Sequence, residues 1–333
     1  MPPPKFVAEH IFSTTAIGIG ALISAVPVCA ASYSQTKVYD STNFFDGFNF
    51  TSDPDPSGGF VKYVDTETAQ SSGMAKVSNG AVYLGANYVD KTTNGRPSTR
   101  VRSKDVFTTG LFVADIANMP AGTGKGGSCG IWPAYWTSRP DWPNSGEIDI
   151  IEGVNGQKSN AVTLHTAKGC NMDVSGSEST ANQTSADCEN SDAGCSQATT
   201  SSNNYGAAFN ANGGGVYVTE WASLSINVWF FPRGTAAANS VINPGAADLD
   251  VAKFGAPLAH FEGNTCNIAE RFKSNYIIFN TNFCGGWASR EFLNDKTCAS
   301  LADTCNDWVA NNPAAFNEAY WLVNSVKIYA RNN

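Results

Sequence analysis

Short runs of β-branched and aromatic residues recur along the 333-residue chain, and they constrain the fold more than any other feature. Several of them alternate apolar with polar residues, which is typical of strands with one buried face, and Gly- or Asn-bearing breaks separate them. Helical periodicity is scarce, and residues 296–311 are the best candidate for a helix. The pattern predicts an all-β fold. The runs that carry this prediction are residues 81–84, 99–103, 110–116, 223–231 and 276–280.

The first thirty residues differ in character from the rest. Residues 11–28 form an apolar stretch softened by Ser, Thr and Gly, and small residues follow that suit cleavage after Ala30 or Ala31. This arrangement predicts a secretory signal peptide over residues 1–31. An uncleaved signal anchor stays open as the alternative, because the stretch is near the lower limit for spanning a bilayer. With no internal repeat and no long linker, we expect a single domain over residues 32–333.

The charge balance narrows the possible partners. Only 15% of the residues are charged and the net charge is −8, so the chain lacks the basic surface that nucleic acids and anionic membranes require. We therefore expect no nucleic acid partner and, after signal cleavage, no membrane partner, whereas a neutral polymer fits. Glycosylation sequons at Asn49 and Asn182 also suit an exported surface, although short sequons often arise by chance.

Nine cysteines are present, and removing the leader with Cys29 leaves 9 − 1 = 8. An even number in an exported chain predicts up to four disulfides, with roughly a hundred pairings open. A zinc site would need closely paired cysteines, and no C-x-x-C occurs, so we expect neither a metal nor a cofactor. Residues 173–214 are rich in Ser, Thr, Asn and Gly. Because Cys170, Cys188 and Cys195 bracket this segment, we predict a disulfide-stapled loop rather than disorder.

The central motif is a run of carboxylates and isoleucines, Gly146-Glu147-Ile148-Asp149-Ile150-Ile151-Glu152-Gly153. On a strand Glu147 and Asp149 share one face, and the first two isoleucines point to the other. A regular strand would turn Glu152 into the core, at a cost of several kcal/mol by order of magnitude. A β-bulge around Ile150-Ile151 restores the phase and returns Glu152 to the face of the other carboxylates.

The bulged spacing also predicts a mechanism. Four pleat steps place the Cα atoms of Glu147 and Glu152 roughly 13 Å apart, which two converging side chains reduce to about 5 Å between carboxyls. A separation of about 5–5.5 Å is typical of retaining glycosidases, whereas inverting enzymes need about 6.5–9.5 Å. Spacing does not say which glutamate attacks. Asp149 lies between them, where it could hold or pass a proton and orient the nucleophile. A Ca²⁺ site or a solvated strand face is less favoured, because calcium loops are irregular and closely packed like charges need a reason.

Tryptophans are dense just upstream of the carboxylates. Indole faces stack on sugar rings, and Trp142, in a polar turn, is the best candidate for this role. Trp132 stands beside Ile131 and Pro133 and could equally belong to the core. His165 ends a run that we predict to pair with the carboxylate strand, and from the residues alone a structural histidine is the expected outcome. No Ser-His-Asp pattern surrounds it.

The carboxylate motif resembles the E-x-D-x-x-E signature of glycoside hydrolase family 16. Further segments resemble the fungal endo-β-1,3(4)-glucanases, or laminarinases, of that family, and the similarity spans nearly the whole mature chain. These segments are Trp132-Pro133-Ala134-Tyr135-Trp136, Asp141-Trp142-Pro143-Asn144, Glu152-Gly153-Val154-Asn155, Thr163-Leu164-His165-Thr166, and residues 209–215 and 282–287.

The resemblance implies a concanavalin A-like β-jelly roll with few short helices and a concave substrate cleft. It implies Glu147 as the nucleophile, Glu152 as the acid/base and Asp149 as the assisting carboxylate. The bulged spacing is typical of relatives that act on β-1,3-glucans, and the unbulged spacing of lichenase-like relatives. The expected substrate contacts are Trp136, Trp142, His165, Trp287, Arg100 and Trp132.

We therefore expect a secreted, extracellular and monomeric endo-1,3(4)-β-glucanase that binds β-glucan polysaccharide, cleaving β-1,3 and mixed β-1,3/1,4 linkages with retention. A cell-wall transglycosylase of the same fold would use the same glutamates. A non-catalytic glucan-binding protein is the alternative from another class.

Overall fold

The computed structural model describes residues 31–122, 124, 126–172, 179–245, 248–263 and 265–332. Ala31–Asn333 form one compact unit. The predicted leader, residues 1–31, lies outside the described residues apart from Ala31. Among the helices described, none combines the length and the apolar character needed to cross a membrane.

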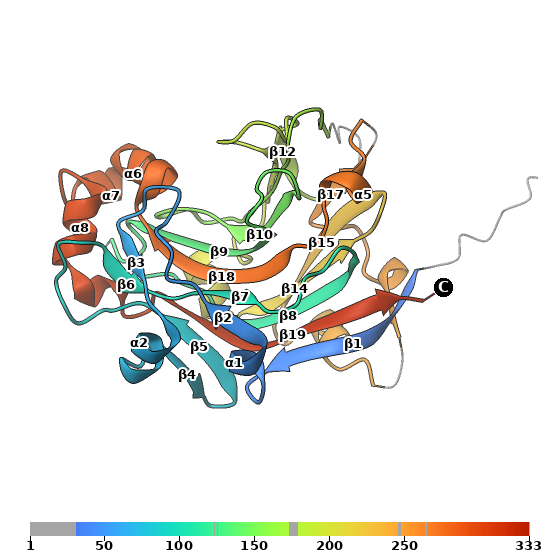
Figure 1. Cartoon of the computed structure of the whole chain (residues 1–333), viewed down its shortest axis with the longest axis horizontal. Coiled ribbons are helices and arrows are strands. Elements are labelled where there is room, and N and C mark those ends of the chain that lie inside the picture. The colour runs from blue at the N-terminus through green and yellow to red at the C-terminus, as the bar shows by residue number, and fades with distance from the viewer. Residues whose placement is uncertain are drawn as a thin grey trace, which may run out of the picture. The chain divides into compact units, whose positions relative to one another are not determined.

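Two large antiparallel sheets form the body of this unit (Figure 1). The outer sheet runs in the order β16 (Leu249–Asp250), β1 (Ser32–Asp40), β19 (Tyr320–Arg331), β8 (Gly110–Asn118), β14 (Gly215–Trp221), β15 (Ser225–Pro232) and β17 (Ala259–Glu262), and β5 (Ala81–Gly85) joins β19 to β4 (Ala75–Ser78). The inner sheet runs β12 (Asn182–Ser185), β13 (Cys195–Ala198), β11 (Ala161–His165), β10 (Glu147–Glu152), β9 (Ile131–Ser138), β18 (Tyr276–Phe283), β7 (Arg100–Ser103) and β2 (Phe48–Phe50). A short parallel pair, β3 (Val61–Tyr63) and β6 (Arg96–Ser98), lies apart from both.

The main core lies between the two sheets. Along β18, Ile277 and Phe279 enter this core, while Asn280 and Asn282 fall on the opposite face, which is the alternation that a strand imposes. Facing strands contribute Trp321 and other large side chains, which are fully buried. The predicted all-β sandwich is confirmed, and strands β5, β7, β8, β15 and β18 lie where the sequence predicted strands.

Short helices connect the strands, and one helix prediction is wrong. Residues 296–311 do not form a single helix, because Thr304 caps a new one, its hydroxyl oxygen accepting a hydrogen bond from the Asp307 amide. The longest described helix, α6, was not predicted. The helices are α1 (Phe44–Gly47), α2 (Thr66–Ser71), α3 (Gly206–Ala211), α4 (Ala236–Ile242), α5 (Ile268–Arg271), α6 (Gly285–Asn294), α7 (Lys296–Ala299) and α8 (Cys305–Asn311), with 3₁₀ turns η1 (Val251–Lys253) and η2 (Pro313–Phe316).

The polar segment 173–214 is more regular than predicted. Strands β12 and β13 extend the inner sheet, and α3 follows them. Hydrogen bonds from β13 to β11, and from β12 to β13, stabilise strands that lack β-forming side chains. Residues 173–178 lie outside the described residues. Disulfides do staple the segment, and the prediction of up to four disulfides is confirmed, with pairings that the sequence left open. They are Cys129–Cys298, Cys170–Cys266, Cys188–Cys195 and Cys284–Cys305.

Candidate active site

Strand β10 carries the predicted bulge. On its β9 side, Asp149 pairs with Trp136 and Ile151 pairs with Tyr135, so Ile150 is one extra residue on β10. The same shift interrupts the pairing with β11 between Asp149 and Glu152. The three isoleucines of the motif are buried in the core, whereas Glu147 and Glu152 are both partly exposed. The bulge therefore lets both glutamates face away from the core while every isoleucine remains inside it.

A buried side chain satisfies the backbone groups that the bulge leaves without sheet partners. Asn160, fully buried just before β11, donates from Nδ2 to the Ile150 carbonyl at 2.7 Å. Its Oδ1 accepts a hydrogen bond from the Glu152 amide at 2.9 Å. One amide side chain thus replaces two ladder hydrogen bonds at the position where Glu152 leaves the regular register.

The three carboxyls disfavour one another's charged forms. Burial, followed by the charge of Glu152, raises the pKa of Glu147 well above its usual value. Burial also raises the pKa of Glu152. Asp149 is only 2% exposed, and burial together with the two glutamate charges raises its pKa well above the ordinary range. The group therefore holds protons near neutral pH, which is the condition that general acid catalysis requires.

Two kinds of neighbour act against these upward shifts. A hydrogen bond from Ser138 and the positive charge of Arg100 lower the pKa of Glu147. The indole N–H of Trp132 donates to Glu152 Oε1 at 2.8 Å and lowers the pKa of that carboxyl. Each glutamate thus has its own support for the ionised form, but these shifts do not separate the nucleophile from the acid.

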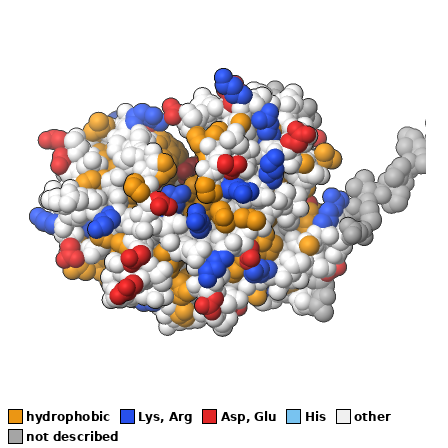
Figure 2. Space-filling view, viewed as in Figure 1, with side chains coloured by type: hydrophobic (Ala, Val, Ile, Leu, Met, Phe, Trp, Pro, Cys, Tyr) orange, Lys and Arg blue, Asp and Glu red, His pale blue; other side chains and the backbone are white. Residues whose placement is uncertain are grey.

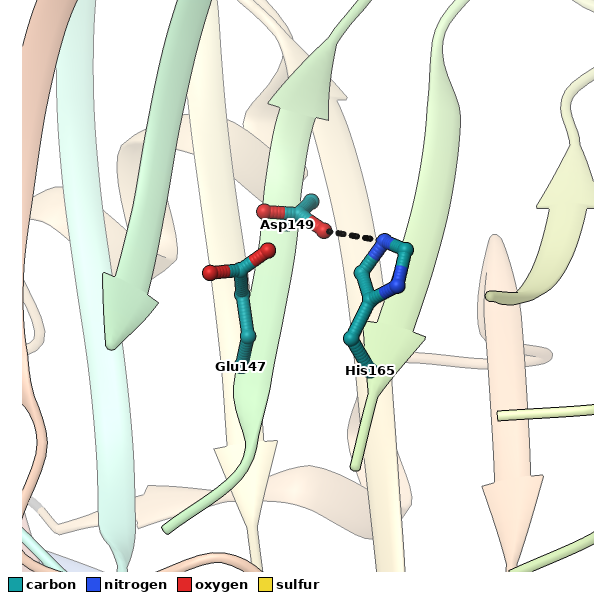
Figure 3. A group of neighbouring side chains, drawn as sticks. All are labelled: Glu147, Asp149 and His165. Carbon is teal, nitrogen blue, oxygen red and sulfur yellow. Dashed lines mark ion pairs between the residues drawn. The ribbon is translucent and has the colours of Figure 1, made fainter. Parts of the chain in front are cut away.

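His165 lies beside Asp149 at the end of β11 (Figure 3). Its Nε2 is 3.6 Å from Asp149 Oδ2, and its Nδ1 is 3.2 Å from the Asn190 carbonyl oxygen. Burial lowers the pKa of His165, so the ring is neutral near pH 7. Ligand-type atoms of Glu147, Asp149 and His165 all lie within 4.8 Å of one another. Because Nδ1 is engaged by the Asn190 carbonyl, Nε2 is the ring nitrogen that faces the carboxyls.

The other predicted contacts gather around the same face. Trp136 donates from Nε1 to Asn280 Oδ1 at 2.7 Å, and the Arg100 guanidinium stands 5.2 Å from its ring centroid. Trp132 is partly exposed and meets Trp287 edge-on, with ring centroids 5.6 Å apart, so Trp132 is not a core residue.

Trp142 is 44% exposed, as its polar turn predicted, and its ring centroid lies 6.5 Å from that of His165. In Figure 2 the surface is hollowed at its upper edge, between the side that carries α6–α8 and the side that carries β12, and hydrophobic side chains border the hollow.

Sequence reasoning missed several polar members of this site. Asn280 holds Trp136 and also donates to the Tyr63 hydroxyl at 3.3 Å, and Tyr63 stacks on the other side of Arg100 at 5.7 Å. The sequence did carry a signal for Asn280, because Asn280 and Asn282 alternate with apolar residues on β18. Tyr63 and Asn160 carry no local signal, because their roles depend on contacts across the fold.

Known proteins resemble this chain closely. Residues 48–329 match the family model described as the XgeA-like, catalytic GH16 domain. A probable endo-1,3(4)-β-glucanase of Aspergillus fumigatus is 40% identical over 95% of this chain, and an endo-1,3(4)-β-glucanase of Arthroderma benhamiae is 42% identical over 90% of it. The chain covers 50% and 65% of those two proteins, so it spans about half to two thirds of the length of the curated relatives it matches.

Solved structures agree with these relatives. Laminarinase 16A of Phanerochaete chrysosporium, solved with 6-O-glucosyl-laminaritriose in donor and acceptor sites, superposes with a TM-score of 0.83 and 37% identity. An elongating family 16 β-1,3-glucosyltransferase gives a TM-score of 0.79 and 39% identity, and in both comparisons 90% of this chain and 100% of the other are covered. The predicted jelly roll is confirmed by these neighbours, and the chain belongs to glycoside hydrolase family 16, as an XgeA-like catalytic domain.

Proposed function

We propose that this chain is an endo-1,3(4)-β-glucanase that cleaves its substrate by double displacement with retention at the anomeric carbon. The observation that carries the proposal is the bulged strand β10, which presents Glu147 and Glu152 on one face and keeps the isoleucines in the core. The names of relatives about 40% identical to the chain support β-1,3(4)-glucan as the substrate class.

In the proposed reaction Glu147 attacks the anomeric carbon while Glu152 gives its proton to the departing glycosidic oxygen. Burial raises the pKa of Glu152 to about 7 and that of Glu147 to about 8, so either carboxyl can hold a proton near neutral pH and these shifts do not assign the acid role. A water molecule then enters, Glu152 takes its proton, and the hydroxyl displaces Glu147 from the sugar. Asp149 remains protonated beside the nucleophile and limits the negative charge of the group. The roles of the two glutamates follow the family resemblance, not the spacing.

Laminarin and mixed-linkage β-glucan test this proposal. The wild type, Glu147→Ser and Glu152→Gln are incubated with each polymer, and the product sizes and the anomeric configuration of early products are measured. We expect internal cleavage with retained β-configuration in the wild type and a loss of at least about a thousandfold in kcat for Glu147→Ser, a typical size for loss of a nucleophile. Equal activity in that variant, or inverted product, would refute the assignment.

Glucan transfer is the second candidate, and one observation favours it. The elongating glucosyltransferase is 39% identical to this chain, slightly above the 37% of the laminarinase. A transferase uses the same first displacement and lets a sugar hydroxyl replace water in the second. Products longer than the starting oligosaccharide at moderate substrate concentration would identify transfer. A complete lack of products with retained glucan binding would instead indicate a binding protein.

We further propose that residues 32–333 act as a secreted, extracellular and monomeric domain. Four disulfides are typical of proteins that fold in an oxidising compartment. The side chains of both sequon residues, Asn49 and Asn182, are exposed, so each is accessible to glycosylation. Sequencing the N-terminus of the protein from culture medium tests cleavage after Ala30 or Ala31, and light scattering tests the monomer.

A further inference from the structure

A small disulfide-closed loop encloses one side of the His165 ring. The loop, residues 188–195, joins β12 to β13, and the Cys188–Cys195 bridge closes it. The Cys188 carbonyl accepts a hydrogen bond from the Thr166 amide at 2.8 Å, and Cys195 pairs with Leu164 in the sheet. Both ends of the loop are therefore fixed to the residues that flank His165.

Inside this loop a backbone carbonyl meets the imidazole. The Asn190 oxygen lies 3.2 Å from His165 Nδ1 and also accepts the Gly194 amide at 2.9 Å. A carbonyl oxygen can only accept, so the hydrogen bond requires the proton to be on Nδ1. In the neutral ring Nε2 then carries a lone pair, and Nε2 is the atom that faces Asp149.

Asp149 offers the complementary group. Its Oδ2 is buried and, among the described residues, forms no hydrogen bond within normal distance, although Nε2 stands 3.6 Å away. That gap is slightly too long for a hydrogen bond, and a small rotation of either side chain closes it. Asp149 Oδ2 is buried without a partner in the described part of the chain, and the nearby His165 Nε2 has a free lone pair. We therefore place the carboxyl proton on Oδ2, directed at Nε2.

We propose that loop 188–195 is a positioning element that fixes His165 as the Nδ1–H tautomer. Nε2 then accepts a hydrogen bond from protonated Asp149, which keeps this carboxyl neutral beside Glu147. No covalent bond is made or broken in this arrangement, since the proton stays on Asp149 and is shared with the ring. With the other tautomer Nε2–H would point at Oδ2 and stabilise the ionised carboxylate. A negative charge beside Glu147 would then make ionisation of the nucleophile less favourable.

The charged and titratable groups around the ring are few. Glu147 and Asp149 face it from β10, and the charge of Asp192, in the loop, favours the protonated ring. Burial lowers the pKa of His165, and the Asn190 carbonyl and the charge of Asp192 act in the opposite direction. Loosening the loop admits water to the ring, so it should raise the pKa of His165 and mix the two tautomers.

Gly194 gives a way to disturb the ring without removing it. A Cβ at this position would lie 2.8 Å from His165 Cε1, 2.6 Å from the Leu164 carbonyl oxygen and 2.6 Å from Thr163 Cγ2, so Gly194→Ala must move the loop off the ring. Gly80→Ala is the matched control, because Gly80 also has a positive φ and has nothing within 4 Å of its Cβ position. Backbone strain is common to both substitutions, and ring displacement belongs to the first alone.

The first measurement is the protonation pattern of the imidazoles by ¹⁵N-histidine NMR of the full chain between pH 5 and 8. We expect wild type and Gly80→Ala to show a neutral His165 with its proton on Nδ1. In Gly194→Ala we expect mixed tautomers and a His165 pKa raised by about one unit, the usual spread between environments. Cys188→Ala/Cys195→Ala should give the same change, and Cys284→Ala/Cys305→Ala, which removes a bridge far along the chain from His165, should not.

The second measurement rests on the proposed glucanase activity. The acid limb of kcat/KM reports ionisation of the nucleophile in the free enzyme, so we expect this limb to move up by about one pH unit in Gly194→Ala. His165→Gln supplies an acceptor oxygen near the Nε2 position and should keep the wild-type limb, whereas His165→Phe should shift it like Gly194→Ala.

A wild-type ring with its proton on Nε2 would overturn the proposal. So would a folded Gly194→Ala, or a folded double-cysteine variant, with an unchanged tautomer and an unchanged acid limb. If wild type cleaves no glucan, the proposed function fails, yet the NMR result still decides whether the loop sets the tautomer. The two failures are therefore distinguishable.

Discussion

The clamp formed by Asn160 gives the sharpest test of the bulged strand. Asn160→Ala removes the donor to the Ile150 carbonyl, in a buried hydrogen bond, and the acceptor of the Glu152 amide, in a partly buried one. A buried polar group left without a partner costs about 1–3 kcal/mol, so the Ile150 carbonyl predicts a loss of about that size in the free energy of unfolding, and the Glu152 amide adds to it. The bulge also loses the contacts that fix its register, so Glu152 should no longer be held on the same face of β10 as Glu147.

Urea unfolding at pH 6 measures the stability, and kcat on laminarin, well below the melting temperature, measures the site. We expect kcat to fall at least about tenfold in the folded variant, since misplacing a reacting group by about 1 Å can cost far more. Asn155→Ala is the control, because Asn155 makes a similar two-bond clamp, from its amide to Gly130 and Ala288. It should lose comparable stability with a smaller change in kcat. A stability loss below about 0.5 kcal/mol, or a wild-type kcat, would refute the reasoning for Asn160.

Three further predictions follow from burial and charge. The raised pKa of Glu152 means that the native state binds a proton more tightly than the unfolded chain, so native stability falls as the pH rises above the ordinary glutamate value. The melting temperature of Glu152→Gln should therefore exceed that of the wild type at pH 8 and equal it at pH 4. Equal melting temperatures at pH 8 would contradict this reasoning. Trp142→Ala should raise KM several-fold, for a stacking contribution of about 1 kcal/mol, with little change in melting because the side chain is 44% exposed. Arg96→Met should lower the free energy of unfolding by about 2–5 kcal/mol in a urea titration, because the buried guanidinium donates to the Asn87 and Val309 carbonyls. It should leave kcat unchanged, because the guanidinium touches no carboxylate of the site. A loss of kcat in the folded variant would argue against a purely structural role.

Local patterns predicted the bulged carboxylate strand, because its acidic residues and its register both follow from adjacent residues in the sequence. The alternation of acids and isoleucines leaves Glu152 out of phase, and only a bulge reconciles the phase with burial, so the bulge was predictable. The residue that stabilises it was not, since Asn160 lies eight positions downstream of Glu152 and becomes relevant only when β11 pairs with β10.

Helices and long-range contacts were harder to predict for similar reasons. Helix α6 begins with Gly285 and Gly286, which disfavour a helix locally, yet the helix buries Ala288 and packs Phe292 into a satellite core. Residues 296–311 have the composition of one helix, but the cap at Thr304 divides it. The pairing of the cysteines, such as Cys129 with Cys298 across 169 positions, depends on the finished fold.

The disulfides separate two stages in the making of this protein. Sheet hydrogen bonds, the buried isoleucines and the Asn160 clamp hold the strand that carries the glutamates, and none of them needs an oxidant. The loop over His165 and the start of α6, next to Trp287, are instead tied by Cys188–Cys195 and Cys284–Cys305. A newly synthesised chain in a reducing compartment can therefore bring the carboxyls of β10 together before the two bridges around them have formed. If the proposed glucanase function holds, oxidation of these two bridges would complete the surroundings of the site after the sheets have formed.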